Sequence, residues 1–334
     1  MKFTSIFLQQ LRKIFKVYLC DRGVIVSVFN TIVTIWDIRT TMYDKRDDKF
    51  PLFVFFHYFR DTNSTEMKAM IFAAGLGTRL KPLTDTLPKA LVPVCGKPLI
   101  EHVARKLLSA GIDEAVVNIH YFADKVEQWI DGEEWIVTEK SDKDDNKMLV
   151  EISDERQLLL ETGGAVLHAR RYLEGCGRFL IHNVDILSNC DIKWFERQVK
   201  EDALASLLVS DRKTTRFLLF EPDTLRMVGW VNTDSGDYSV ISPDIVPAEC
   251  RALAFSGIHI LSDKVLALME EYVLEKGLPV DEEKGTRFPI MSFYMWAAAK
   301  QPIYGVVAED LQFIDVGKLD ALKPAEEFLK AEVL

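Results

Sequence analysis

A short apolar segment that runs directly into a glycine-rich turn constrains this chain more than any other feature. Residues Met67–Ala74 (MKAMIFAA) form an apolar run of strand length, which is typical of a buried β-strand. Gly75 and Gly77 follow at once, and Thr78 and Arg79 come next. Two glycines let the backbone bend sharply and bring its N–H groups close to an anion. The segment therefore predicts a strand that ends in an anion-binding turn.

Strand-like and helix-like segments alternate after this turn. We expect helices over 97–110, 122–130 and 164–173, strands over 114–120, 135–139, 149–153 and 178–183, and a closing helix over 318–329. Four further strand-like segments predict an antiparallel insertion beside the main sheet: 205–210, 216–220, 227–231 and 252–260. The alternation predicts an α/β fold with a mainly parallel central sheet and with ligands at the carboxyl ends of its strands.

The charge balance of the chain excludes some partners. The 334 residues include 41 Lys and Arg against 51 Asp and Glu, a net charge of -10. This acidity argues against a dedicated nucleic-acid binder, which needs a basic surface, but it permits small phosphorylated ligands. The five cysteines show neither paired nor zinc-binding spacing, so we expect reduced thiols in a cytoplasmic protein: Cys20, Cys95, Cys176, Cys190 and Cys250.

Residues 1–66 differ from the remainder, with ten Lys and Arg against seven Asp and Glu. Their uncharged run, Gly23–Trp36, is shorter than the ~20 residues that span a bilayer, and no small-residue cleavage site follows it. A membrane or targeting segment stays an alternative. We expect instead that translation begins at Met67, and that residues 1–66 are either an artefact of start-codon choice or a poorly ordered extension. Residues 67–330 would then form the main folded domain.

Two cations follow the glycine turn, and they extend its chemistry. Arg79 offers a planar fork for two phosphate oxygens, and Lys89 offers a compact point charge. Taken singly, each is typical of a surface cation. Leu80 stands where the dinucleotide fingerprint needs its third glycine, and the phosphate loop of P-loop enzymes does not match either. The combination therefore favours a triphosphate over a dinucleotide and disfavours a dinucleotide-dependent oxidoreductase.

The stretch from Gly75 to Pro98 fits the pattern G-x-G-T-R-x-x-P-L-T-x-x-x-P-K-x-L-x-P-V-x-G-K-P. It resembles the signature of the sugar-1-phosphate nucleotidyltransferases, or nucleotide-sugar pyrophosphorylases. The likeness spans about Met67–Leu329. It is closest to the branch of N-acetylmuramate-1-phosphate uridylyltransferase-like and mannose-1-phosphate guanylyltransferase-like proteins.

The resemblance implies a Rossmann-like, three-layer α/β/α fold and a reaction. A nucleoside monophosphate passes from an NTP to a sugar 1-phosphate with Mg²⁺, which releases pyrophosphate and forms an NDP-sugar. Such a protein serves nucleotide-sugar biosynthesis, for example for cell-envelope polysaccharide. The resemblance makes Arg79 the grip on the leaving pyrophosphate and Lys89 the cation at the reacting phosphates.

The resemblance also assigns the other site residues. Asp185, at the end of the 178–183 strand, and Asp315 would hold Mg²⁺, although each aspartate is also typical of a cap or turn residue. Val184 and Phe313 depart from the family pattern beside them. The nucleotide would contact Ala74, Gly75, Gly77, Thr78, Asn118, Thr162, Gly163 and Gly164.

Sugar binding is assigned to Ser256 and Gly257, although the E-K-P segment of the thymidylyltransferases is missing. The basic cluster of Arg212, Lys213 and Arg216 is either a solvated face or a contact for an anionic sugar or sugar phosphate. Leu160–Gly164 is expected to precede a helix, and His120 is more typical of a structural histidine.

The base, the sugar and the choice between a monomer and a homo-oligomer stay open. The partners expected are an NTP and a sugar 1-phosphate, with no nucleic acid and no membrane. The alternative is a catalytically silent, nucleotide-sugar-binding regulatory subunit of the same fold. Such a subunit would be expected to lack one of the two cations or one of the two aspartates, and this chain has all four.

Overall fold

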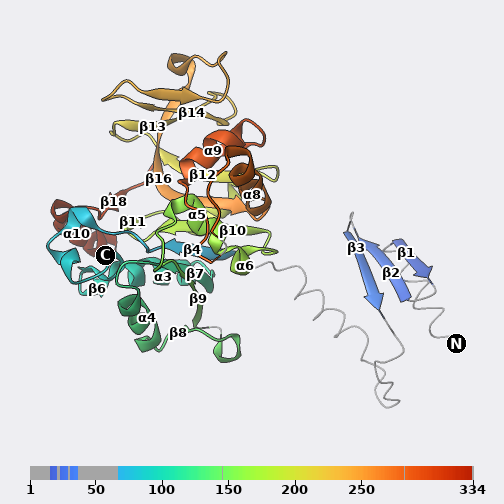
Figure 1. Cartoon of the computed structure of the whole chain (residues 1–334), viewed down its shortest axis with the longest axis horizontal. Coiled ribbons are helices and arrows are strands. Elements are labelled where there is room, and N and C mark those ends of the chain that lie inside the picture. Colours follow the sequence, from blue (N-terminus) through green and yellow to red (C-terminus); the bar gives the residue numbers. More distant parts are fainter. Residues whose placement is uncertain are drawn as a thin grey trace. The chain divides into compact units, whose positions relative to one another are not determined.

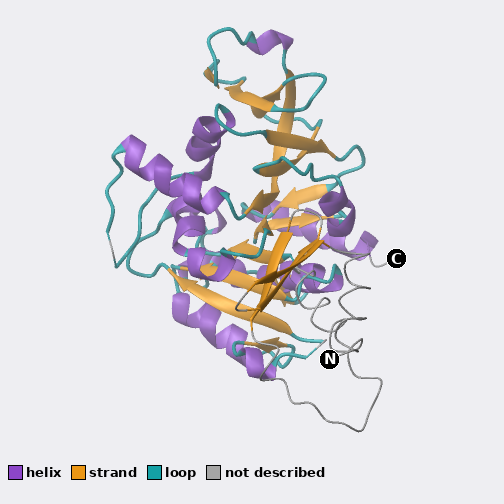
Figure 2. Ribbon diagram, turned by 90° about the vertical axis from the view of Figure 1, so that its right-hand side faces the viewer, coloured by secondary structure: helices purple, strands orange, loops and turns teal. Residues whose placement is uncertain are grey.

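The computed structural model describes residues 16–20, 23–28, 31–36, 67–144, 146–281 and 283–332 (Figures 1 and 2). The chain divides into two compact units, Met1–Ser64 and Thr65–Leu334. The described part of the first is an antiparallel sheet in the order β1 (Lys16–Cys20), β2 (Gly23–Val28) and β3 (Thr31–Trp36). The other expectations for residues 1–66 fall outside the described residues. Within the described ranges, no helix has the length and apolar character needed to cross a bilayer.

The second unit is built on one large sheet in the order β15-β14-β13-β16-β10-β4-β7-β9-β8, with β12 between β16 and β17. Strands β10, β4, β7, β9 and β8 are mutually parallel, and β16 runs antiparallel to β10. The predicted α/β fold with a central parallel sheet is therefore confirmed. The strands are β4 (Lys68–Phe72), β7 (Glu114–Ile119), β8 (Ile136–Val137), β9 (Met148–Asp154), β10 (Arg178–Asn183), β12 (Ala205–Ser210), β13 (Arg216–Phe220), β14 (Met227–Asn232), β15 (Tyr238–Val240), β16 (Arg251–Ser262) and β17 (Ile303–Val307).

Helices cover both faces of this sheet. Alternate residues of β4 divide between the two sides: Ala69 and Ile71 enter one buried cluster, and Met70 enters the other. The first cluster includes residues of α3, α4 and α7, and the second includes residues of α5, α8 and α9, which makes three layers. The helices are α3 (Leu99–Ser109), α4 (Ala123–Gly132), α5 (Glu161–His168), α6 (Arg170–Leu173), α7 (Ile192–Arg197), α8 (Val265–Lys276), α9 (Ile290–Ala298) and α10 (Leu322–Glu332).

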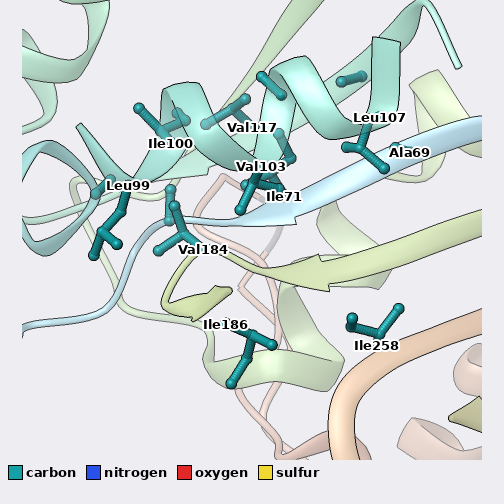
Figure 3. Close-up of a cluster of buried hydrophobic side chains, with 14 of the residues drawn as sticks. Ala69, Ile71, Leu99, Ile100, Val103, Leu107, Val117, Val184, Ile186 and Ile258 are labelled. Atoms are coloured by element: carbon teal, nitrogen blue, oxygen red, sulfur yellow. The ribbon is translucent and has the colours of Figure 1, made fainter. Parts of the chain in front are cut away.

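Helix α3 shows how the sequence fixes this packing. Leu99, Val103 and Leu107 recur at helical spacing, are buried, and lie over Ala69 and Ile71 of β4 (Figure 3). Burying one leucine stabilises the fold by roughly 1.5–3 kcal/mol. This stripe therefore holds α3 against the strand that leads into the glycine turn.

Three predicted helix starts are wrong. The closing helix α10 begins at Leu322 and not at residue 318, after a 3₁₀ turn at Leu319–Ala321. Residues Lys97–Pro98 form the short strand β6, which pairs with β5 (Pro93–Val94), so α3 begins only at Leu99. Helix α5 begins at Glu161, which places Gly163 and Gly164 inside its first turn and not before it. A hairpin with Pro93–Val94 sets the start of α3, and hydrogen bonds to the carbonyl of Phe288 hold the first turn of α5.

The antiparallel insertion continues the main sheet and does not lie beside it. Strand β16 pairs with β10 through His259 and with β13 through Leu253, so one long strand serves both parts. Figure 1 shows β13 and β14 extending from the outer end of β16. A separate two-stranded ribbon joins β11 (Ile186–Ser188) to β18 (Phe313–Asp315). This ribbon matters most for the site below.

Candidate functional site

The loop after β4 turns sharply at Gly77. This residue has a φ of 62°, and its carbonyl accepts hydrogen bonds from the N–H of Leu80 and from Thr84 Oγ1, both at 2.8 Å. A Cβ at Gly77 would lie 2.8 Å from Thr84 Cγ2. The glycine is therefore required both by the backbone conformation and by the close approach of Thr84.

Three backbone N–H groups of the same loop have no hydrogen-bond acceptor among the described residues. No described residue accepts a backbone hydrogen bond from the N–H groups of Gly75, Leu76 or Gly77. Gly75 and Thr78 are exposed, whereas Ala74 is buried at the end of the strand. Consecutive unpaired N–H groups in a turn form a concave site for an anion. The predicted bend after the strand is present, and anion binding by its N–H groups stays a prediction.

Lys89 and Asp185 meet although they are far apart in the sequence. Lys89 starts a short 3₁₀ turn, Lys89–Leu91, and Asp185 lies between β10 and β11. Lys89 Nζ forms an ion pair with Asp185 Oδ2, and the two side chains are 12% and 15% exposed. The lysine stem passes close to the loop, with its Cδ 4.0 Å from the Cβ position of Gly75.

Asp315 reaches the same place through the β11–β18 ribbon. It pairs with Ile186 in the antiparallel register, and the N–H of Val316 donates to the carbonyl of Asp185 at 2.8 Å. Partial desolvation and then the negative charge of Asp185 raise the pKa of Asp315, whereas Lys89 and Arg79 act to lower it. Each of these groups is therefore close enough to affect the charge of Asp315.

Arg79 lies over Gly317, a residue that sequence reasoning did not single out. A Cβ at Gly317 would lie 2.8 Å from Arg79 Nη2 and 2.6 Å from Asp315 Oδ1. The residue must be small for both side chains to occupy this place. The position of Gly317, two residues after Asp315, was the available signal. Two cations and two carboxylates are thus gathered at the carboxyl end of β4 and β10.

The two carboxylates suit a hard divalent cation. Mg²⁺ is commonly bound by one or two carboxylates together with substrate phosphates and water. Among the described residues, no three or more His, Cys, Asp and Glu side chains form a metal-binding group. Asp185 and Asp315 therefore match a site that phosphate oxygens complete, and not a closed site made wholly of protein ligands.

The sugar-side residues lie on β16, next to β10, the strand that Asp185 follows. Ser256 Oγ accepts from the N–H of Ile258 at 3.2 Å and is buried. Gly257 has a φ of 83°, and a Cβ there would lie 2.7 Å from Asn183 Nδ2. Sugar contact by Ser256 or Gly257 stays a prediction.

Arg212, from the basic cluster, is directed toward the site. Its guanidinium carbon lies 4.7 Å from the centre of the Phe313 ring, and Nη2 is 3.5 Å from the carbonyl oxygen of Phe255. Burial lowers its pKa, and the charge of Asp315 opposes that shift. No carboxylate among the described residues forms an ion pair with it. Arg212, Lys213 and Arg216 are all exposed, and Arg212 differs from Lys213 by its contacts with Phe313 and Phe255.

Residues expected at the base have protein partners instead. Asn118 is buried; its Oδ1 accepts from the N–H of Ala73 and its Nδ2 donates to Glu155. Thr162 Oγ1 accepts from the N–H of Ile290 at 2.9 Å. The N–H groups of Gly163 and Gly164 both donate to the carbonyl of Phe288, at 2.9 and 3.1 Å. Their contact with nucleotide stays a prediction, and each has a structural role.

Glu155 is a residue that sequence reasoning missed. It is 2% exposed, and burial raises its pKa to about 7. His120 Nδ1 lies 2.7 Å from the carbonyl oxygen of Glu155, so the histidine also serves the structure here. The only sequence signal for Glu155 was its position directly after a strand, at the end where ligands gather.

Comparisons with known proteins agree with this geometry. Residues 68–332 match the family model described as nucleotidyl transferase. The N-acetylmuramate alpha-1-phosphate uridylyltransferase of Caulobacter vibrioides is 36% identical over 207 residues, 60% of this chain and 76% of that protein. The protein of the same name from Neisseria meningitidis is 31% identical over 218 residues, 64% and 83% of the two chains.

A more distant relative is mannose-1-phosphate guanyltransferase beta-B of Xenopus laevis, at 25% identity over 248 residues, 71% of this chain and 62% of that one. Among solved structures, apo UDP-glucose pyrophosphorylase superposes with a TM-score of 0.60 at 16% identity, covering 80% of this chain and 100% of that one, which shows the shared fold. The signature residues, the fold and the family match lead to one conclusion: this chain belongs to the nucleotidyl transferase family and is a nucleotidyltransferase.

Proposed function

We propose that this protein transfers a nucleoside monophosphate from an NTP to a sugar 1-phosphate. An oxygen of the sugar phosphate attacks the α-phosphorus, the bond from that phosphorus to the bridging oxygen breaks, and pyrophosphate leaves. The observation that carries the proposal is the meeting of Lys89, Asp185 and Asp315 beside Arg79. A reaction of this kind needs positioning and charge neutralisation more than covalent chemistry from the protein.

Each group has a distinct task in this proposal. The open N–H groups of Gly75 and Leu76 hold the triphosphate, and Arg79 stabilises the charge that develops on the leaving pyrophosphate. Lys89 stabilises the charge at the reacting phosphate. Asp185 and Asp315 would hold Mg²⁺. When bound, the metal ion supplies Lewis-acid polarisation of phosphate oxygens.

Two comparisons support uridylyl transfer as the first activity to test. The two relatives that match 207 and 218 residues, at 36% and 31% identity, are both named N-acetylmuramate alpha-1-phosphate uridylyltransferases. UTP and N-acetylmuramate 1-phosphate are therefore the proposed pair, with GTP and mannose 1-phosphate as the next. Arg212, which has no carboxylate partner among the described residues, is the proposed contact for the phosphate of the sugar substrate.

The test is a matrix of reactions with the purified full chain and MgCl₂. Each of UTP, GTP, CTP and dTTP is combined with N-acetylmuramate, glucose, mannose and N-acetylglucosamine 1-phosphates, and pyrophosphate release is measured. We expect one nucleotide and one sugar to dominate and the activity to vanish with EDTA. If no pair releases pyrophosphate while the protein still binds an NDP-sugar, the protein is a silent binding subunit and the catalytic proposal fails.

A further inference from the structure

The buried carboxyl group of Glu155 has no part in the reaction scheme above. Both of its oxygens accept hydrogen bonds: Oε1 from Asn118 Nδ2 at 2.8 Å and Oε2 from the N–H of Leu160 at 3.1 Å. Its side chain is 2% exposed, and an acid at such depth is costly to keep unless its polar atoms are paired. The two hydrogen bonds therefore fix this side chain in one position.

A further hydrogen bond links this pair to the glycine loop. Asn118 Oδ1 accepts from the N–H of Ala73 at 2.8 Å, and Ala73 stands two residues before Gly75. Ala73, Asn118, Glu155 and Leu160 thus form one continuous hydrogen-bonded chain, which we call the loop-anchoring chain. It connects the start of the glycine loop to the start of α5.

The sheet register places the loop-anchoring chain along the edge of the sheet at which the glycine loop leaves β4. Strands β4, β7 and β9 are parallel neighbours, with Phe72 beside Asn118 and Asn118 beside Ser153. The carboxyl ends of parallel strands lie along one edge, so Ala73, Asn118 and Glu155 follow that edge in order. None of these side chains is among those gathered at Asp185.

We propose that Glu155 and Asn118 are positioning residues for the nucleotide, which hold the glycine loop so that its open N–H groups face the triphosphate. The inference rests on the proposed function, because it assumes that the loop binds an NTP. Neither residue is placed at the reacting atoms. Loss of the pair weakens NTP binding and leaves sugar binding nearly unchanged.

The direction of the hydrogen bonds allows a sharp test. Asn118 donates and Glu155 accepts, so Glu155→Gln sets an amide N–H against one of the two donors. Asn118→Asp alone sets two carboxylates against each other. Together the two changes exchange donor and acceptor. In the double variant, the carboxylate at position 118 accepts from the N–H of Ala73 and from the side-chain amide at position 155. The oxygen of that amide accepts from the N–H of Leu160, as Glu155 does in wild type. The double variant therefore restores every hydrogen bond and keeps the charge.

The measurements are UTP and GTP binding to the full chain with MgCl₂, by calorimetry, and steady-state kinetics with the active pair. We expect each single variant to raise the Kd and the KM for the nucleotide about tenfold, since one buried hydrogen bond is lost. The KM for the sugar 1-phosphate should change less than twofold, and the double variant should return to within about threefold of wild type. Glu151→Gln, in β9 and half-exposed, is the matched control.

Several results would overturn the inference. Single variants with wild-type nucleotide affinity would do so, as would a folded double variant still weakened tenfold. If the two residues had a purely structural role, the single variants would have a lower melting temperature and a lower kcat, with both KM values unchanged. This result would also overturn the inference. If a single variant fails to fold, the double variant alone decides. If the wild-type chain binds no NTP and turns over no pair, the proposed function itself has failed.

Discussion

Glycines stand in two motifs of this chain, and the structure places them in opposite surroundings. In the loop after β4, Gly75 is exposed, and the nearest atom to an added Cβ is 4.0 Å away. In the first turn of α5, Gly163 and Gly164 are buried, and both N–H groups donate to Phe288. A Cβ on Gly164 would lie 2.0 Å from the carbonyl oxygen of Thr286.

The difference separates two uses of glycine that look alike in a sequence. The missing side chain leaves room for a ligand at Gly75, and it leaves room for another backbone segment at Gly164. Open N–H groups accompany the first case, and satisfied N–H groups accompany the second. The predictions below test whether the two regions divide binding from stability in this way.

The largest effect is expected at the reacting end of the glycine loop. Lys89→Ala should lower kcat by about 1000-fold, since it removes a fixed positive charge from the reacting phosphate. Pyrophosphate release gives the rate, and circular dichroism should show the native spectrum. Lys81→Ala, an exposed lysine of the same loop, should keep the activity. A rate near that of wild type for Lys89→Ala would remove the residue from the mechanism.

In the α5 region, Gly164→Ala should act on stability. The added methyl group would overlap the backbone at Thr286, so the free energy of unfolding should fall by about 3 kcal/mol. Urea unfolding measures this. The KM for the NTP separates packing from the predicted nucleotide contact, because a pure packing role leaves it unchanged in the folded fraction. Gly132→Ala, in α4 with open space around it, should be neutral or slightly stabilising. Equal stability of both variants would contradict the packing role.

The pH dependence of stability tests the loop-anchoring chain, which connects the glycine loop to the start of α5. Burial raises the pKa of Glu155 from 4.5 to about 7, so the folded state binds this proton more tightly than the unfolded chain does. The stabilisation is complete below pH 4.5 and is lost as the pH rises through 7, by roughly 3 kcal/mol at most. Urea unfolding from pH 4.5 to 8 should show that wild type loses stability relative to Glu155→Gln as the pH rises. Parallel curves for the two would contradict it.

A buried histidine acts on the opposite side of the pH range. Burial lowers the pKa of His182 from 6.5 to about 4, so the unfolded chain binds this proton more tightly. Its stabilising effect is present above pH 6.5 and is lost as the pH falls through 4. Most of the decline that belongs to Glu155 falls between pH 4.5 and 7, where His182 acts in the opposite direction. It is therefore read as the difference between the wild-type and Glu155→Gln curves, because His182 is present in both.

Arg212 tests whether sugar binding can be separated from nucleotide binding. Arg212→Ala should raise the KM for the sugar 1-phosphate about tenfold, since a charge-assisted contact is lost, and should leave the KM for the NTP within twofold. Steady-state kinetics with each substrate varied in turn gives both values. Lys213→Ala, the exposed neighbour, is the control. An equal rise in both KM values would place Arg212 outside the sugar subsite.

The smallest effect is expected at Gly75. Gly75→Ala has room for the methyl group, so the free energy of unfolding should change by less than about 0.5 kcal/mol. The methyl group would occupy space beside the open N–H groups, so the KM for the NTP should rise about fivefold. Calorimetric melting and kinetics test the two parts. A large loss of stability with normal KM would place Gly75 in the same class as Gly164.

Local patterns predicted much of this molecule. The apolar stripe of α3 and the run before Gly75 gave the right elements, because burial on one face imposes a period that short segments display. The predictions failed where pairing with another backbone segment, near or distant, decides. Lys97–Pro98 became a strand because it pairs with Pro93–Val94, and α5 starts at Glu161, where Phe288 accepts the hydrogen bonds of its first turn.

The sequence by itself determined the bent loop after β4, the alternation of strands and helices, and the family signature, since these depend on the order of nearby residues. Only the tertiary structure decided that Asp315 meets Asp185, because that contact requires the pairing of β11 with β18. It also decided that Gly164 packs and Gly75 stays open, and that Glu155 is buried at the loop. Contacts between segments far apart in the chain leave no periodic trace in the sequence.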